Sequence, residues 1–252
     1  MAGPQGQTSR GPPAPTQARA GRPVKLRFTE RLLMVLLYYR VYVPQEFVGF
    51  LFGVDKGTVS RDVPELGLCM AGVFRIPERQ VRIAPDDLVA VFVDATEQPV
   101  NRPSRRQRRS YSGKKKRLTV KHQVVVTRKR KEPGGKQKVR IKAVSKAAKG
   151  RERDKKVYDQ SRLRIALAVP KSGDRGYQGS NLRVPRKKPR NGALSDEEKR
   201  SNRRLARERI VAEHGIGKMK IWRIAADRYH NPPRRHTVMM KKVAVLHNRM
   251  CG

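Results

Sequence analysis

The stretch Leu88-Val-Ala-Val-Phe-Val-Asp94-Ala-Thr-Glu97 decides how the rest of the chain is interpreted. Six apolar residues lead into a carboxylate, which is typical of a strand that is buried on both faces and delivers a polar group to the edge of a sheet. In open sheets, functional residues gather beyond the carboxyl ends of such strands, so Asp94 is a candidate for chemistry. An aspartate that merely begins a turn would give the same pattern.

The composition indicates a polyanionic partner. The 252 residues include 60 Lys and Arg against 21 Asp and Glu, which gives a formal net charge of +39. Charge on this scale favours binding to nucleic acid. It is concentrated in residues 100–153, where Glu132 and Glu152 are the only acids. Acids that interrupt basic stretches either balance their neighbours or have a function, and this singles out Asp94, Asp174 and Glu213.

Other classes of protein are disfavoured. The longest uninterrupted apolar runs have eight residues, well short of the roughly 20 that a membrane-spanning helix needs, so we expect no membrane segment. The two cysteines, Cys69 and Cys251, offer neither a disulfide framework nor the spacing of a metal site, which fits a reducing cytosol and disfavours zinc as a cofactor. The length suits one sizeable core and a small accessory domain.

The N-terminal quarter divides into a tail and a helical domain. Residues 1–23 are rich in Pro and Gly and contain no acid, so we expect a disordered tail. Residues 24–64 show helical patterns instead. Thr29 can cap a first helix, Pro44 can begin a second that ends at Gly53, and Asp55 can cap a short third helix that stops before Pro64. The expected apolar stripe of the first helix consists of Leu32, Leu33, Leu36 and Leu37.

Two apolar helices, a glycine turn and a short polar helix predict a helix-turn-helix domain, whose last helix would lie in a DNA major groove. The side chains expected to reach phosphates or base edges are Lys56, Thr58, Ser60 and Arg61. Three packed helices with no role in DNA binding would give the same pattern. We expect residues 65–86 to connect this domain to a larger one that spans residues 87–252.

The larger domain begins with three strands. Residues 101–117 are basic and favour an exposed loop or hairpin tip. Residues 118–127 and 138–144 alternate apolar with basic side chains, which predicts strands with one wet face. Together with the stretch at residues 88–94, they suggest an antiparallel meander.

Helices and a glycine-rich loop follow. Residues 154–168 favour a helix, and three glycines surround Asp174 in residues 173–179, which lets the backbone approach a ligand closely. Ser195 begins a capping box that opens a long helix. If that helix continues past Gly215 and Gly217, then Arg209, Glu213 and Lys220 share one face; a salt-bridged, solvated face has the same spacing. Residues 236–250 predict a last helix that covers the sheet.

The order of three strands, a helix, a short fourth strand reaching an Asp and a helix bearing a Glu resembles the ribonuclease H-like core. The chain is similar to the DDE transposases of bacterial insertion sequences, in the superfamily that includes Harbinger-type elements, over roughly residues 28–249. The motifs that carry the resemblance are Asp94-x-Thr96-Glu97, Tyr111-Ser112-Gly113-Lys114-Lys115, Gly173-Asp174-x-Gly176-Tyr177-x-Gly179 and Arg209-x3-Glu213-x6-Lys220.

This resemblance implies an α/β fold with a mixed sheet flanked by helices and a small all-α N-terminal domain. It implies that Asp94, Asp174 and Glu213 are the catalytic triad and metal ligands, and that Arg209 and Lys220 contact the transposon end. Such oxygen ligands suit Mg²⁺, with Mn²⁺ as a possible substitute, and two ions would promote an in-line displacement. Glu97 is expected to support the triad from outside, and Lys114, Lys115 and Lys116 are expected to contact DNA.

The expected partners are double-stranded DNA, both as transposon ends and as target, and further copies of the chain in a homodimer or higher oligomer. The expected location is the cytoplasm, at the bacterial nucleoid. Two alternatives remain open: a sequence-specific DNA-binding protein without catalysis, such as a repressor or a decayed transposase, and a basic protein of the ribosomal or chromatin type.

Overall fold

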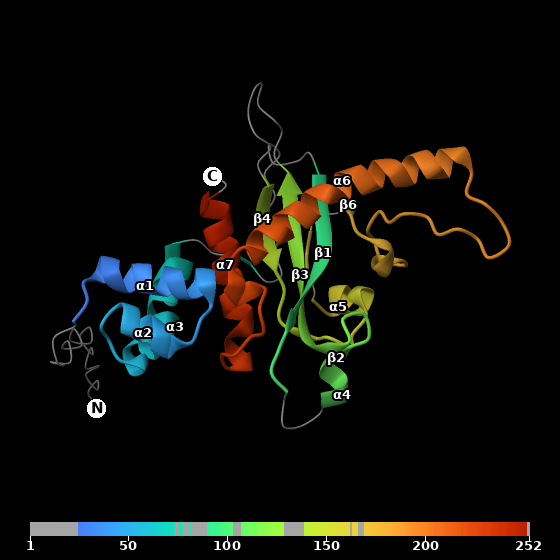
Figure 1. Ribbon diagram of the computed structural model, residues 1–252. Coiled ribbons are helices and arrows are strands. Elements are labelled where there is room, and N and C mark those ends of the chain that lie inside the picture. The colour runs from blue at the N-terminus through green and yellow to red at the C-terminus, as the bar shows by residue number, and fades with distance from the viewer. Residues whose placement is uncertain are drawn as a thin grey trace, which may run out of the picture.

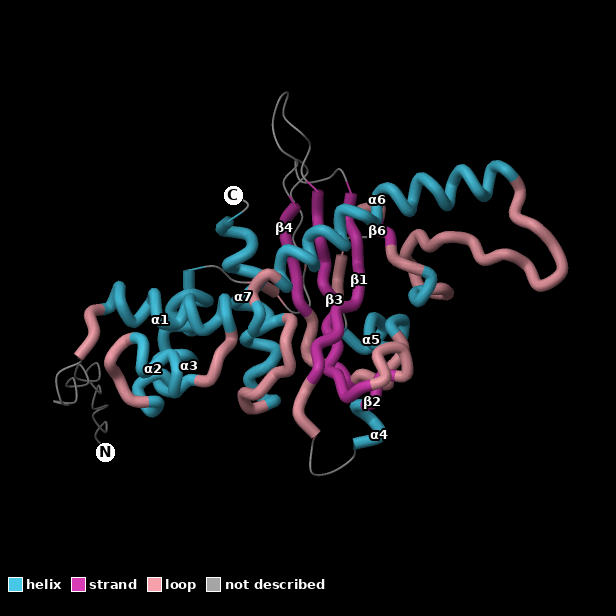
Figure 2. Tube along the Cα trace, viewed as in Figure 1, coloured by secondary structure: helices cyan, strands magenta, loops and turns pink. Residues whose placement is uncertain are grey.

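The computed structural model describes residues 25–73, 76–77, 81, 90–102, 107–128, 139–161, 163–165 and 169–250. The expected disordered tail at residues 1–23 lies outside the described residues. Figures 1 and 2 show a helical N-terminal part, a central sheet, and a long helix that crosses the sheet and projects beyond it. This is the predicted α/β class, a mixed sheet with flanking helices and a small helical domain. In the part of the chain that the structure describes, no helix is long and apolar enough to span a bilayer.

The sheet is built around β3 (Arg117–Arg128). This strand pairs antiparallel with β1 (Ala90–Pro99) on one side and with β4 (Val139–Val144) on the other, which confirms the predicted meander. The short strands β2 (Tyr111–Ser112) and β5 (Ala148–Lys149) also pair with β3. Finally, β6 (Lys171–Ser172) runs parallel to β1 and pairs with Val91 and Phe92. The sheet is therefore mixed.

Both faces of the central strands are covered. One face, which includes Phe92, Val124 and Val126, belongs to a core shared with the helices at both ends of the chain. The other face, with Val93 and Val125, packs against the segment that follows β5. The prediction of one wet face for residues 118–127 is therefore wrong. Helices cover both faces, so even polar side chains of β3 are buried: Lys121, His122, Gln123 and Thr127.

The N-terminal domain consists of α1 (Phe28–Val41), α2 (Gln45–Leu51) and α3 (Lys56–Val73). Two predictions about α1 are wrong. Arg27, not Thr29, is the N-cap, because the Glu30 carboxylate accepts a hydrogen bond from the Arg27 backbone N–H at 2.7 Å. The buried face is not the leucine stripe, since Leu33 is 59% exposed. Its buried residues are Met34, Val35, Tyr38 and Tyr39.

Helix α3 begins as predicted, with the Asp55 carboxylate accepting from the Thr58 N–H at 3.1 Å. It does not stop before Pro64 but continues to Val73, so it takes in the first part of the expected connector. Proline cannot donate the helical hydrogen bond, but burial of Val63 and Leu66 in the shared core offsets that loss.

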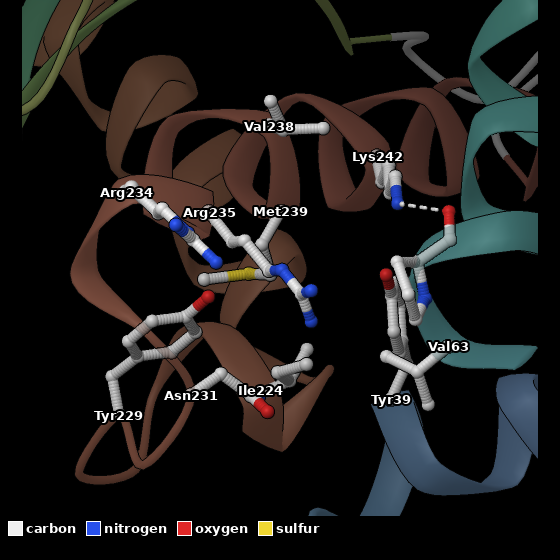
Figure 3. A pocket seen from close by; sticks show the side chains of 11 residues that line it. Tyr39, Val63, Ile224, Tyr229, Asn231, Arg234, Arg235, Val238, Met239 and Lys242 are labelled. Carbon is white, nitrogen blue, oxygen red and sulfur yellow. Dashed lines mark hydrogen bonds between the residues drawn. The ribbon is translucent and has the colours of Figure 1, made fainter. Parts of the chain in front are cut away.

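The N-terminal domain packs against the end of the chain (Figure 3). Here lie the short helices η3 (Arg223–Ala225) and η4 (Pro233–Arg235) and the helix α7 (His236–Met250), whose bounds match the prediction. A cavity of about 350 Å³ lies between Tyr39 and Val63 on one side and Tyr229 and Met239 on the other. The buried Lys242 ammonium donates to the Pro64 carbonyl at 3.5 Å. The two domains thus share one core.

The remaining helices are α4 (Gln107–Ser110), α5 (Asp154–Ser161), η2 (Arg175–Tyr177) and α6 (Asp196–Lys220). The prediction of a helix through residue 168 is wrong beyond Ser161. Residues 163–165 are not helical: the Arg164 carbonyl accepts from the Val81 N–H at 3.0 Å, and Ile165 is buried. Residues 162 and 166–168 of that prediction lie outside the described part. Pairing of this segment with Val81 replaces the helical bonds.

Candidate active site

Asp94 lies within β1, opposite Val124 of β3. The expectation that the strand ends at this residue is wrong, because pairing with β3 continues to Pro99. The carboxylate accepts a hydrogen bond from the Ala95 N–H at 2.8 Å. Burial raises the pKa of Asp94 to about 6; the charges of Asp174 and Asp154 act in the same direction, while the Ala95 N–H and the charge of Arg209 oppose them. Asp94 is thus a half-buried acid that lies near other acids.

Asp174 reaches the same region because β6 pairs with β1 only two residues before Asp94. It caps η2, and its carboxylate accepts from the Gly176 N–H at 2.7 Å. Gly173 is needed here: a Cβ at this position would lie 2.9 Å from the Leu182 side chain and 3.0 Å from the ring of Tyr177. The glycine loop thus holds Asp174 close against packed side chains.

Tyr177 is the buried support of this loop. Its hydroxyl donates to the Gln123 side-chain oxygen at 2.5 Å, and its ring meets that of Tyr158 edge-on. Burial raises the pKa of Tyr177 far above its ordinary value, and the charges of Asp94, Asp154 and Asp174 add to the effect. Because the hydroxyl stays protonated, it serves as a hydrogen-bond donor that ties the loop to β3.

Glu213 lies on α6, which persists past both glycines as the shared-face prediction requires. Its carboxylate accepts from the Arg209 guanidinium at 2.8 and 3.1 Å, and the Glu213 side chain is 51% exposed. Among the described residues, no three His, Cys, Asp or Glu side chains form a cluster that could hold a metal ion as they stand. The structure brings Asp94 and Asp174 together, and it pairs Glu213 with Arg209 instead.

Lys220 lies near Asp94, and Lys115 lies near Lys220. Burial, followed by the charge of Lys115, lowers the pKa of Lys220, while Asp94 and Glu97 act in the opposite direction. Lys220 therefore lies within electrostatic reach of all three. Lys115 comes from the exposed turn between β2 and β3, which also contains Lys114 and Lys116. Lys115 of this turn thus lies near Lys220 at the end of α6.

Glu97 belongs to a buried ion network that the sequence did not reveal. Its carboxylate contacts the Lys121 ammonium at 3.1 Å and accepts from the Thr119 hydroxyl at 2.9 Å. Lys121 also contacts the Asp154 carboxylate at 3.0 Å. Burial alone would raise the pKa of Glu97, but hydrogen bonds from Ser112, Thr119 and Lys121 bring it below its ordinary value.

This Glu97–Lys121–Asp154 network links β1, β3 and the start of α5. Lys121 and Asp154 were missed because a basic residue in an alternating strand suggests exposure, and an Asp before a helix suggests only a cap. The useful signal was that Glu97 and Lys121 are direct cross-strand neighbours. That relation appears only once the strand register is known.

The candidate DNA-contacting residues of the N-terminal domain lie on the first turns of α3. Lys56, Ser60 and Arg61 are exposed, and Lys56 pairs with Glu46 at 2.5 Å. The Thr58 hydroxyl donates to the Asp55 carboxylate at 2.7 Å and accepts from Arg61 at 3.1 Å. Thr58 is thus half-buried in local hydrogen bonds, whereas the other three side chains are exposed, with Lys56 and Arg61 each making one surface contact.

The chemistry of the acidic side chains suits a hard divalent cation. Asp94 and Asp174 supply only oxygen ligands, and the partial burial of Asp94 beside other acids leaves negative charge that such a cation would neutralise. These two residues fit a metal. Glu213 fits only after its carboxylate leaves Arg209.

Comparison with known proteins agrees with this arrangement. Residues 93–248 match the family described as DDE superfamily endonuclease, and residues 24–71 match the helix-turn-helix of DDE superfamily endonuclease. The chain is 30% identical over 238 residues to a protein of Microchaete diplosiphon named as a probable transposase for insertion sequence element IS702, covering 91% of this chain and 83% of the relative.

A second relative, from Streptomyces albus G, is named as a transposase for insertion sequence element IS112. It is 28% identical over 211 residues, which cover 83% of this chain and 75% of the relative. No solved structure matches the chain. With its helix-turn-helix domain, its mixed sheet and its paired aspartates, the chain belongs to the DDE superfamily endonucleases that act as transposases of insertion sequences.

Proposed function

We propose that the protein cleaves DNA at the ends of its insertion element and joins the freed 3′-hydroxyl to target DNA in the same site. The observation that carries the proposal is the position of Asp94: a half-buried carboxylate with a pKa raised to about 6, beside which the pairing of β6 with β1 delivers Asp174. Burying acids together costs stability, and catalytic sites are where that cost is commonly found.

Asp94 and Asp174 would hold Mg²⁺, or Mn²⁺ in its place, with Glu213 as the third ligand. When bound, a pair of such ions supplies activation of the attacking oxygen and stabilisation of the leaving oxygen in an in-line displacement. Glu97 would support the metal ligands without binding the metal itself, because its pairing with Lys121 and the contact of Lys121 with Asp154 fix the strand that carries Asp94.

Arg209 would hold the DNA phosphate near the cleaved bond. Two of its guanidinium nitrogens now donate to one carboxylate oxygen of Glu213, Oε1, and a phosphate could accept hydrogen bonds from the same two nitrogens. Transfer of Arg209 from Glu213 to the phosphate would free the carboxylate to turn towards Asp94. Lys220 and the lysines of the turn between β2 and β3, Lys114, Lys115 and Lys116, would bind phosphates on either side of the cleaved bond.

The N-terminal domain would recognise the element end through Lys56, Thr58, Ser60 and Arg61. Because α3 continues to Val73, the domain would end there and not at residue 64 as expected from the sequence, and the catalytic domain would span residues 87–252. Because two element ends must be cut and joined together, the active form would be a homodimer or a higher oligomer. Its substrate would place it on the bacterial nucleoid, in the cytoplasm.

One observation favours a second candidate function, DNA binding without catalysis. The Glu213 carboxylate is engaged by Arg209 and is half exposed, so the third ligand is not gathered with the first two. A repressor or a decayed transposase would retain the DNA-binding residues and need no such gathering.

A nicking assay on the repeats that flank the element decides between the two functions. With Mg²⁺ present, the wild type should nick the end, and Asp94→Asn should be slower by a factor of about 10³ or more, because a metal ion contributes several kcal/mol at about 1.4 kcal/mol per tenfold. Asp159→Asn is the matched control, since Asp159 is exposed and pairs with Lys155. Equal rates for the wild type and Asp94→Asn would end the catalytic proposal.

A further inference from the structure

The N-terminal half of helix α6 contributes no residue to the catalytic site. Its C-terminal half packs on the sheet through the buried residues Ala212, Ile216 and Met219. Its N-terminal half extends beyond the sheet, preceded by a long loop (Figures 1 and 2). The loop is tied to this half by Asn202, which exchanges hydrogen bonds with the Arg186 backbone at 2.8 and 3.0 Å. We call residues 184–207 the arm.

The arm presents one row of cations. Arg200, Arg203, Arg204 and Arg207 are all exposed, and their spacing of three, four and seven residues places them on one side of the helix. Two of the arm's three acids pair elsewhere, Asp196 with Lys199 and Glu198 with Arg186, and Glu197 forms no ion pair with a described residue. Among the described residues, none of the four arginines forms an ion pair with an acid. We call these four residues the arginine stripe.

The stripe is unfavourable for the isolated helix. Like charges three and four residues apart on a helix repel each other, and the arm has little core contact to offset that repulsion. The Ser195–Glu198 capping box holds its first turn. Glu197 and Glu208 lie three and four residues from Arg200 and Arg204, but among the described residues neither forms an ion pair with the stripe. Four arginines against two acids leave this side of the helix positively charged, which favours a polyanion as its partner.

The stripe faces away from the catalytic residues. Arg209 follows Arg207 by two residues, which at about 100° per residue turns it about 200° around the helix. Arg209 contacts Glu213 and acts on Asp94, whereas Arg207 is on the other side. Figure 1 also shows the arm and the N-terminal domain at opposite ends of the molecule. DNA is stiff over about 150 base pairs, so a duplex lying along the catalytic face would leave the stripe free.

We propose that the arginine stripe binds the phosphate backbone of a second DNA duplex, the target, separately from the element end. Guanidinium groups contact phosphates in bidentate geometry and need no particular base sequence to do so. The contact to duplex DNA stands on the stripe alone; its assignment to the target rests on the proposed function.

The salt dependence of binding tests the contact. The probe is a fluorescent duplex of about 30 base pairs with unrelated sequence, short enough to stay straight, and the protein is the full chain. Replacing all four stripe arginines by Gln should reduce the slope of log affinity against log salt by about 0.9 for each lost phosphate contact, up to about 3.6. Replacing them by Lys should keep most of the slope, because the charge remains.

The control variant removes four exposed cations that lie on separate segments: Lys146, Arg151, Arg164 and Arg228. Its charge change equals that of the Gln variant, but its four cations do not form a row along one duplex. Its slope should therefore fall by less than half as much. An equal fall in both variants, or no fall in the Gln variant, would overturn the stripe as a site. Circular dichroism should show that the Gln variant keeps its helix, since Gln is a good helix former.

Strand joining tests the assignment to the target. With a short end duplex and a plasmid target, the Gln variant should nick the end within about twofold of the wild type and join it to the plasmid about tenfold more slowly, the effect of about 1.4 kcal/mol in target affinity. Equal losses in nicking and joining would overturn the assignment. A wild type that does neither reaction would instead refute the proposed function, and the salt slopes would still decide the stripe.

Discussion

The two halves of α6 share one helical backbone but differ in almost everything else. The C-terminal half carries small residues against the sheet, where Ala212 and Gly215 allow close approach, and its position fixes Arg209 and Lys220 near Asp94. The N-terminal half extends past the sheet and carries exposed arginines. The comparison teaches that packing, not helix formation, decides which charges on α6 belong to the acidic site.

The largest expected contrast is in stability. Met219, in the packed half, is 1% exposed, and Met219→Ala should lower the free energy of unfolding by about 2–5 kcal/mol because it leaves a cavity. Leu205, in the arm, is half-buried, and Leu205→Ala should cost less than about 1 kcal/mol. Urea unfolding followed by the fluorescence of the single Trp222 measures both. Similar losses would show that the arm is packed after all.

The two glycines of α6 should respond with opposite signs. A Cβ at Gly215 would lie 2.9 Å from Val139 and 3.2 Å from Val126, whereas nothing lies within 4 Å of one at Gly217. Gly217→Ala should therefore stabilise the protein by about 0.8–1 kcal/mol through helix propensity alone. Gly215→Ala should destabilise it by about 1 kcal/mol, since overpacking exceeds that gain. Thermal melting of the two variants measures this, and a gain in both would disprove close contact with the sheet.

The smallest expected effect is on the pH dependence of nicking. Only deprotonated Asp94 can bind a cation, so the rate should fall as the pH drops below the Asp94 pKa of about 6. The positive charge of Arg209 lowers that pKa. Arg209→Gln removes the charge, so the acid limb of the rate profile should move to higher pH.

Arg207→Gln is the matched control, because it removes the same charge from the opposite side of the helix. Its acid limb should coincide with that of the wild type. An equal movement in both variants would mean that the overall charge of the protein, rather than the packed half of α6, sets the Asp94 pKa.

Elements that depend on local sequence could be predicted. The Ser195 capping box begins α6 at Asp196, and α7 has the predicted bounds. The alternation in residues 118–127 and 138–144 gave the two antiparallel strands. These patterns arise from contacts within a few residues, so the chain encodes them wherever it folds.

Elements that depend on partners were predicted less well. Both faces of β3 are covered, so its polar residues are buried although their alternation with apolar ones suggested exposure. Helix α3 passes through Pro64 because burial of Val63 and Leu66 offsets the missing hydrogen bond. The helix beginning at Asp154 ends at Ser161, since the Arg164 carbonyl pairs with Val81, far away in the sequence.

The sequence by itself determined the kind of protein: its basic charge, the order of its strands and helices, and the three acids that interrupt basic stretches. Tertiary structure alone decided which groups meet. It placed Asp174 beside Asp94 through a two-residue strand, joined Glu97 to Asp154 through a buried lysine, and paired Glu213 with Arg209. The reason is physical: burial and charge interactions depend on distances in space, which separation along the chain does not specify.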